Sequence, residues 1–223
     1  SNNQYFIIGD DGIIFDGDEH TITIENCVGY SGLLKIEEYS KSIFRNIILT
    51  TSGSSKLANE AGWIVQSESY QKSSNNNLIS NCTVKADICQ DKDYVNAGIL
   101  GSQSLINDNT NSDFTNYNLK IENCIYDGNI GTNDSNNIIA DGAGLIGSLS
   151  INNSYVIIDK CSSGYWLSVN NKVISCYGAG LVGSFCVKGY SKLEINESFN
   201  SMQIGPETEI GIPHVGGLVG WNC

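Results

Sequence analysis

The sequence is poor in positive charge, proline and methionine. Among 223 residues, 12 lysines and arginines stand against 24 acidic residues, and the net charge is −12. Arg45 is the only arginine, and only 2 prolines and 1 methionine occur. Proteins that bind nucleic acids or anionic membranes gather lysine and arginine on the binding surface, so this composition disfavours both partners.

Long hydrophobic runs and a sustained helical period are also missing. No stretch of 18 or more apolar residues occurs, so we expect no insertion into a membrane. The chain opens without a charged leader and apolar stretch, so we expect any secretion signal to be removed or to lie outside this sequence. The last residues, 221–223, stop one strand into a repeat. This predicts a longer protein, or a neighbour that stacks on that end.

A repeated glycine-rich segment is what the sequence does have. Residues 178–183 read Gly-Ala-Gly-Leu-Val-Gly. Close or looser copies occupy residues 30–35, 60–65, 96–101, 142–147 and 215–220. The anchor glycines are Gly32, Gly62, Gly98, Gly144, Gly180 and Gly217, separated by 30, 36, 46, 36 and 37 residues. A period of about 20 to 50 residues is typical of solenoids and propellers, in which each repeat packs on its neighbours.

Each repeat also contains an apolar strand that ends at one column of residues. The column holds Cys27, Cys82, Cys124 and Cys161, with Ile47 and Ser198 in the other repeats. Apolar residues lie five and three positions earlier, as Ile22 and Ile24 do before Cys27. The final step of three breaks the alternation of two, which predicts a bend. Asn26, Asn46, Asn81 and Asn123 occupy the bend, and asparagine tolerates the left-handed conformation that a corner between two sheets needs.

A second column contains Cys186 and Cys223, each six residues past its anchor glycine. Ser104 and Ser150 take this position in other repeats. Strands stacked about 4.8 Å apart lie within the Cα separation of a disulfide. Cys124 with Cys161, and Cys186 with Cys223, are therefore candidate disulfides. The alternative is a buried ladder of free thiols that pack as small hydrophobic groups, and the sequence leaves the two equally open.

The signature Ala-Gly-Leu-Val-Gly, with strands ending in Asn-Cys, resembles the GLUG-type repeats of right-handed β-helix proteins from bacterial surface adhesins and from giant-virus and environmental sequences. Residues 14–24 resemble the opening coil of such proteins, and residues 46–64 resemble a second coil. The resemblance implies an all-β fold, a right-handed parallel β-helix (solenoid) of about six coils with long polar loops. We expect a single β-solenoid domain over 1–223, with 1–24 as the N-terminal opening coil and 25–223 as the repeats.

No catalytic motif stands out, and the resemblance names no catalytic residue. A sugar-cleaving β-helix needs two carboxyl groups placed across the substrate. The candidates lie in different loops or at unmatched positions: Asp87, Asp91, Asp93, Asp127, Asp141 and Asp159. We therefore expect no enzyme activity, with a carbohydrate-binding or polysaccharide-degrading protein as the alternative. Its first stacking platforms would be Trp63, Trp166 and Trp221, although Trp63 and Trp221 could instead plug the core.

Metal binding and glycosylation have weaker signals. Residues 9–12 and 16–19 could supply oxygen ligands for calcium, but Asp-Gly pairs also make tight turns. We favour turns because the spacing matches no calcium motif, and we expect no other cofactor. Asn133 and Asn152 begin Asn-x-Ser sequons in polar loops and are the candidate glycosylation sites.

The two aliphatic residues of each glycine signature would point to opposite faces of a strand. One stripe, consisting of Leu100, Ile146, Val182 and Val219, should then lie outside the core, covered by loops or by another subunit. Burial of both residues of each pair within one chain would exclude the inter-subunit version. The expected function is a non-enzymatic structural or adhesive module of an extracellular, cell-surface or virion-surface fibre, which self-associates by stacking its ends. Glycans are a further candidate partner.

Overall fold

The computed structural model describes residues 5–72, 74–91, 94–108, 114–131, 141–164, 172–173, 179–204 and 216–223. Within these ranges the chain forms strands, bridges and turns, and no helix. Accordingly, no helix of the described chain is long and apolar enough to cross a membrane. The expectation of an all-β fold is confirmed.

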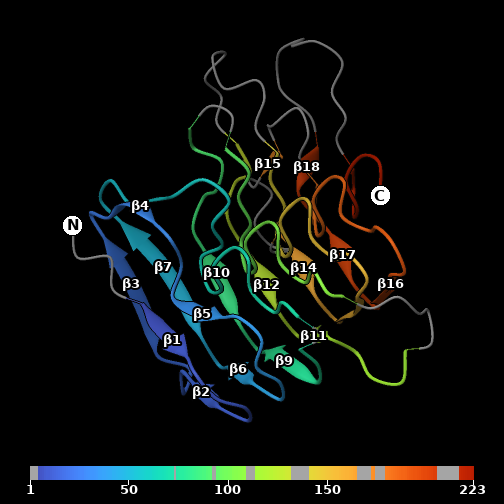
Figure 1. Cartoon of the computed structure of the whole chain (residues 1–223). Coiled ribbons are helices and arrows are strands. Elements are labelled where there is room, and N and C mark those ends of the chain that lie inside the picture. The colour runs from blue at the N-terminus through green and yellow to red at the C-terminus, as the bar shows by residue number, and fades with distance from the viewer. Residues whose placement is uncertain are drawn as a thin grey trace.

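Two six-stranded parallel sheets account for twelve of the strands (Figure 1). The first sheet consists, in chain order, of β2 (Ile14–Asp16), β6 (Ile43–Arg45), β9 (Asn77–Ser80), β11 (Leu119–Glu122), β13 (Tyr155–Asp159) and β16 (Lys192–Asn196). The second consists of β3 (Thr21–Glu25), β7 (Ile48–Ser52), β10 (Thr83–Lys85), β12 (Ile125–Tyr126), β14 (Ser162–Ser163) and β17 (Phe199–Asn200). We call each strand of the first sheet, with the second-sheet strand that follows it, a rung.

Three parallel two-stranded pairs complete the strands. They are β1 (Phe6–Ile8) with β5 (Leu34–Ile36), β4 (Val28–Tyr30) with β8 (Lys56–Leu57), and β15 (Lys172–Val173) with β18 (Gln203–Ile204). Figure 1 shows the rungs side by side in chain order, from the blue N-terminal strands to the orange C-terminal ones. Each rung therefore packs on the rungs that precede and follow it in the sequence.

Like residues of successive rungs meet in columns. One interior column contains Phe15, Phe44, Ile79, Ile121, Ile158 and Ile195. The four middle members are fully buried, whereas the two end members are only partly buried. The core is thus continuous along the stack and open at both ends.

The glycine-rich segments also lie over one another. Parallel bridges join Leu34, Val65, Leu100, Ile146, Val182 and Val219 in one row, and Gly62, Ala97, Ala143, Ala179 and Gly216 in another. This register places Gly32, Gly98, Gly144, Gly180 and Gly217 in a single row. At three of these positions glycine is required, because a Cβ on Gly98, Gly144 or Gly180 would clash with the next backbone carbonyl in the row.

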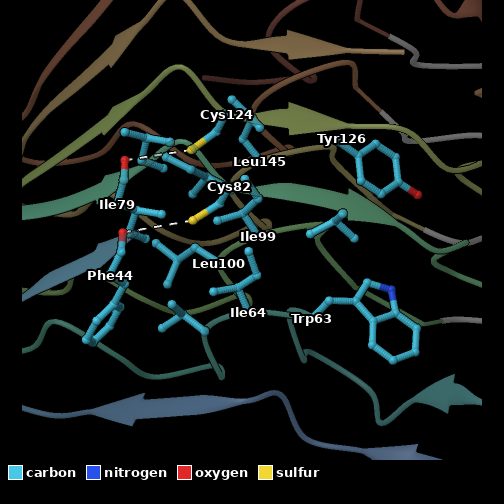
Figure 2. Packing of buried hydrophobic residues seen from close by; sticks show 14 of the residues in the cluster. Phe44, Trp63, Ile64, Ile79, Cys82, Ile99, Leu100, Cys124, Tyr126 and Leu145 are labelled. Atoms are coloured by element: carbon cyan, nitrogen blue, oxygen red, sulfur yellow. Dashed lines mark hydrogen bonds between the residues drawn. The ribbon is translucent and has the colours of Figure 1, made fainter. Parts of the chain in front are cut away.

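The expected anchor at Gly62 is wrong by one residue. Because Gly62 pairs with Ala97 and Val65 with Leu100, the residue opposite Gly98 is Trp63. A Cβ on Gly98 would also strike the ring of Tyr126, and Val84 takes the position of Tyr126 one rung earlier. One rung therefore has the pair Trp63 and Val84, and the next rung has the pair Gly98 and Tyr126, so the large and the small residue exchange positions. Figure 2 shows Trp63 below Tyr126.

The corners between the two sheets match the asparagine prediction in three rungs. Asn46, Asn81 and Asn123 have φ of 55°, 52° and 51°. Lys160 and Glu197 take the same position with φ of 53° and 44°. Asparagine tolerates this conformation best, yet the corner also holds longer side chains because neighbouring rungs hold the backbone in place.

The first rung differs from the expected alignment. Its interior column residue is Phe15, while Ile22 pairs with Leu49 in the second sheet. Four residues, 17–20, turn this corner, so the Cys27 alignment is wrong. Asn26 has a left-handed φ of 48° at the next corner, and the Cys27 N–H donates there to Ser55 Oγ at 3.2 Å. The longer first corner moves every later residue of the rung to another position.

The glycine row yields a stability prediction. Gly98→Ala should lower the free energy of unfolding by about 1–3 kcal/mol, because the added Cβ overlaps the Gly144 carbonyl oxygen and the Tyr126 ring. Gly9→Ala is the matched control, since a Cβ at Gly9 meets nothing within 4 Å. Its stability should change by less than about 0.5 kcal/mol. Urea unfolding measures both, and equal midpoints for the two variants would contradict the proposed register.

Candidate functional site

The candidate carboxylates have separate partners along the stack. Asp87 accepts hydrogen bonds from Asn129 N–H at 2.8 Å and Nδ2 at 3.2 Å. Asp91 pairs with Lys56 at 2.8 Å, and Asp159 with Lys120 at 3.4 Å. Asp127 follows β12, and Asp93 lies outside the described residues. These contacts bind one rung to another rather than placing two carboxylates across a substrate.

Asp141 is the most unusual of these carboxylates. Burial raises its pKa, although hydrogen bonds from Ser148 and Ser184 oppose the shift. Its Oδ1 atom is buried and has no hydrogen-bond partner. An unsatisfied buried oxygen destabilises the charged form, so the carboxyl retains its proton to higher pH than an exposed aspartate.

The candidate calcium ligands take part in turns and inter-rung contacts. Asp16 accepts from Arg45 Nε at 2.7 Å, Asn46 Nδ2 at 2.9 Å and the Asp18 N–H at 3.0 Å. The Asp18 N–H, followed by Asn46 and Arg45, lowers the pKa of Asp16. Asp11 accepts from the Ser40 N–H at 2.8 Å. Within the described part of the chain, no group of three or more His, Cys, Asp or Glu side chains is arranged to hold a metal ion.

The glycosylation and tryptophan candidates divide between described and undescribed segments. Asn133 and Trp166 lie outside the described residues. Asn152 does not lie in a projecting loop, because its backbone bridges Ile106 and Lys188 in neighbouring rungs. Trp63 is fully buried and plugs the core, so it cannot be a sugar platform. Trp221 is 45% exposed and packs edge-on against Phe185 at the C-terminal end.

The predicted assembly stripe is buried within one chain. Leu100, Ile146 and Val182 are fully buried, and so are their neighbours Ile99, Leu145 and Leu181. The inter-subunit version of that hypothesis is therefore wrong. The segment bends between its two bridged residues, as at Gly98 and Ile99, so the alternation of an extended strand does not apply. Both aliphatic side chains of these three segments consequently pack into the core, whereas in the last segment Leu218 is exposed and Val219 partly exposed.

A cysteine ladder lines the corner between the two sheets. The Cys124 N–H donates to Cys161 Sγ at 3.4 Å, and the Cys161 N–H to Ser198 Oγ at 3.0 Å. The thiols of Cys82 and Cys124 donate back to the carbonyls of Phe44 and Ile79, as Figure 2 shows. Burial raises the pKa of Cys124, so it remains a thiol at neutral pH.

A second ladder follows the glycine row. The Ser69 N–H donates to Ser104 Oγ and the Ser104 N–H to Ser150 Oγ, both at 3.2 Å. The Cys186 N–H donates to Cys223 Sγ at 3.1 Å. Cys124, Cys161, Cys186 and Cys223 are free thiols in the structure. Within the ladders, serine and cysteine satisfy the same backbone groups.

A polar hollow of about 280 Å³ lies on the side of the stack between Lys35, Gln71 and Gln103. Its cationic and amide groups already have partners. Lys35 Nζ donates to the carbonyls of Ser67 and Glu68 at 2.6 and 3.0 Å, and Gln71 Nε2 to the Gln103 carbonyl at 2.8 Å. A ligand would have to displace these contacts, so the hollow is a weak candidate for a site.

Exposed apolar side chains gather at the two ends of the stack. Among the described residues, twelve large hydrophobic ones are exposed, of which six lie in residues 5–28 and four in residues 190–221. Phe6 is 54% exposed, although it belongs to the row whose next member, Leu34, is fully buried. At the other end, Phe199 is 46% exposed. The uncovered ends are therefore the candidate functional site.

The N-terminal end is also hollowed. A cavity of about 810 Å³ opens between β1, β2 and β3, and its lining includes Phe6, Phe15, Ile22, Ile24 and Tyr30. The sequence did not point to these residues as a site, because apolar residues in short strands are expected in any core. The signal that could have identified this site is that, among the described residues, no earlier rung precedes Phe15 and covers it.

The cysteine ladder predicts unequal effects of two substitutions at one position. Cys161→Ala should lower the free energy of unfolding by about 1–3 kcal/mol, because it leaves the buried Cys124 N–H without an acceptor. Cys161→Ser should cost less, since Ser198 makes the equivalent contact one rung later. Urea unfolding of both variants tests this prediction. An alanine variant as stable as the serine variant would show that the contact contributes nothing.

The end of the second ladder predicts a pH-dependent thiol. The Cys186 thiol stabilises the Cys223 thiolate and lowers its pKa from 9.0 to about 6. The contribution of this shift to the free energy of unfolding is complete above the pKa that Cys223 has in the unfolded chain. It is lost as the pH falls through the lower pKa that Cys223 has in the folded chain. Alkylation of Cys223 by iodoacetamide should therefore reach half its maximal rate near pH 6, with Cys223→Ser identifying the signal. Cys186→Ala should move the midpoint towards 9, and a midpoint near 9 in the unsubstituted chain would overturn this assignment.

Most of the polar side chains considered above thus have partners along the sides of the stack, Asp141 Oδ1 being an exception, and uncovered apolar surface lies at its ends. Comparison with protein-family models, curated proteins and solved structures found no match to this chain.

Proposed function

We propose that this chain is a right-handed parallel β-solenoid of about six coils, of the GLUG-repeat type, and that it forms a single domain. Its function is that of a non-enzymatic structural or adhesive module in an extracellular, cell-surface or virion-surface fibre. The module assembles by stacking its ends on further β-structure of the same kind. The concentration of exposed apolar side chains at the two ends carries this proposal.

The parallel pairing of rungs supports the solenoid. Each six-stranded sheet has its strands in strict chain order, and the row of bridges through Leu100 runs parallel to both sheets. Parallel strands of one sheet are normally joined by right-handed crossovers, which is the basis for the proposed hand. A stack of this kind stiffens with every rung, because each rung pairs with two others.

The unequal distribution of apolar surface supports assembly through the ends. Between residues 29 and 189 only Ile106 and Leu149 are exposed large hydrophobic residues among those described. The sides of the stack therefore offer little apolar area to a partner. The edge strands β2, β3, β16 and β17 each have a neighbour on one side only within their sheet, and uncovered edges promote association.

Sedimentation velocity across a concentration series, with negative-stain electron microscopy, tests the proposal. The unsubstituted chain should form rods whose length increases with concentration. Phe6→Lys should shift it towards the monomer, because a charge buried at the junction would lose its hydration. Leu149→Lys is the matched control, since Leu149 is 42% exposed but lies in the middle of the stack. It should associate like the unsubstituted chain.

Two outcomes would contradict the proposal. The unsubstituted chain could remain a monomer at every concentration, or Leu149→Lys could disrupt association as strongly as Phe6→Lys. Circular dichroism of each variant distinguishes a lost contact from a lost fold.

A further inference from the structure

The two ends of the stack are the two edges of the same sheets. β2 and β16 are the outer strands of the first sheet, and β3 and β17 those of the second. All neighbouring strands between them are parallel. A further parallel strand added beside β16 would therefore continue the sheet with the same direction and spacing. The β2 strand of another chain has the direction that this position requires.

The interior columns also end with matching residues. Phe15 and Ile195 are the first and last members of one column, and Phe6 and Val219 of another. In the first column, the members between them are all fully buried apolar side chains. Seating Phe15 over Ile195 would give both ends the apolar neighbour that every other member of the column already has.

Charge favours the joining of unlike ends. Residues 5–34 contain six aspartates and glutamates and no lysine or arginine, whereas residues 184–204 contain two lysines and two glutamates. Two N-terminal ends brought together would place two acidic rims in contact, which like-charge repulsion opposes. In the register of the first sheet, Ile14 would lie beside Glu194, and Lys192 would then lie beside Gly12 and near the acidic Asp11.

We infer that the occupant of each end is a second copy of this chain, joined head to tail in the parallel register of the rungs. β2 of one copy pairs with β16 of the next, and β3 pairs with β17. Asp16 then lies beside Asn196, and Thr21 beside Phe199. Such a contact uses two different surfaces and does not close on two copies, so it produces a filament. This inference rests on the proposed function and adds to it the partner, the polarity and the register.

Disulfide trapping tests the register. In a Cys223→Ser background, Asp16→Cys combined with Asn196→Cys places the two new thiols on strands about 4.8 Å apart, within reach of a disulfide. Oxidised glutathione is the oxidant, and it is reduced to glutathione as each bond forms. We expect a ladder of covalent oligomers on a non-reducing gel, which collapses to the monomer after reduction.

The matched control moves one thiol by two residues on the same face of β16. Asp16→Cys combined with Glu194→Cys is out of register by about 7 Å along the strand. It should give no more cross-linking than the Cys223→Ser background, in which the native thiols are the only reactive groups. Each single substitution, Asp16→Cys or Asn196→Cys, should also remain at background.

The results separate this inference from the proposed function. If the chain forms rods but Asp16→Cys alone yields dimers, or the shifted pair cross-links better than the matched pair, the inference is overturned and assembly through the ends stands. If the chain forms no rods at any concentration, both fail, and the ends of the stack must be covered by something other than a second copy.

Discussion

Backbone pairing between successive rungs is the constraint on which the structure depends. In a parallel stack, the N–H and C=O groups of each rung point towards the rungs on either side, so every interior rung is satisfied only when both neighbours are present. Regular strands meet this need along the sheets. At the corners and beside the glycine row the regular pattern breaks, and other groups have to accept the buried N–H groups.

The cysteine and serine ladders provide these acceptors. A thiol or hydroxyl that accepts an N–H from a neighbouring rung and donates to a carbonyl of that rung replaces a broken backbone pair, as Cys161 does with Cys124 and Ile121. Interior amides act similarly: Asn77 accepts from the Ser42 N–H at 3.0 Å and donates to Ser74 Oγ at 2.7 Å. The polar residues inside the stack therefore join rungs.

The same need for two neighbouring rungs explains why the ends of the stack are uncovered. A first or last rung has only one neighbour, so its outward-facing backbone groups and its column side chains are not covered by the described chain. Phe15 and Ile195 are ordinary core residues by composition, and only their position at an end makes them accessible. The proposed self-association would require no specialised binding residues, because its contact would repeat the one already present between rungs.

Several local features could be predicted because they depend on one residue and its immediate backbone. Asn46, Asn81 and Asn123 were expected at left-handed corners, and their φ angles confirm it. The positions shared by Ser104, Ser150, Cys186 and Cys223 were also identified, because a repeat displays equivalent residues directly. In contrast, the redox state of these thiols could not be derived from spacing, since a column is compatible with either form.

The wrong predictions concern register and burial, which depend on the neighbouring rung. Ala61-Gly62 matches Ala97-Gly98 by residue type, yet the pairing of Val65 with Leu100 places Trp63 in the glycine row. Leu100 was expected outside the core because an extended strand alternates its faces, but the chain bends there and buries both residues of the pair. Neither the register nor the bend is encoded in the segment alone.

By itself, the sequence determined the all-β class, the spacing of the glycine-rich segments and the residue types that line the corners, because these follow from local periodicity and backbone preference. Tertiary structure alone decided which residue of one rung faces which residue of the next, and which apolar side chains remain uncovered. The physical reason is that both depend on the packing of segments 30 or more residues apart, and the free energy of that packing belongs to the stack rather than to any single repeat.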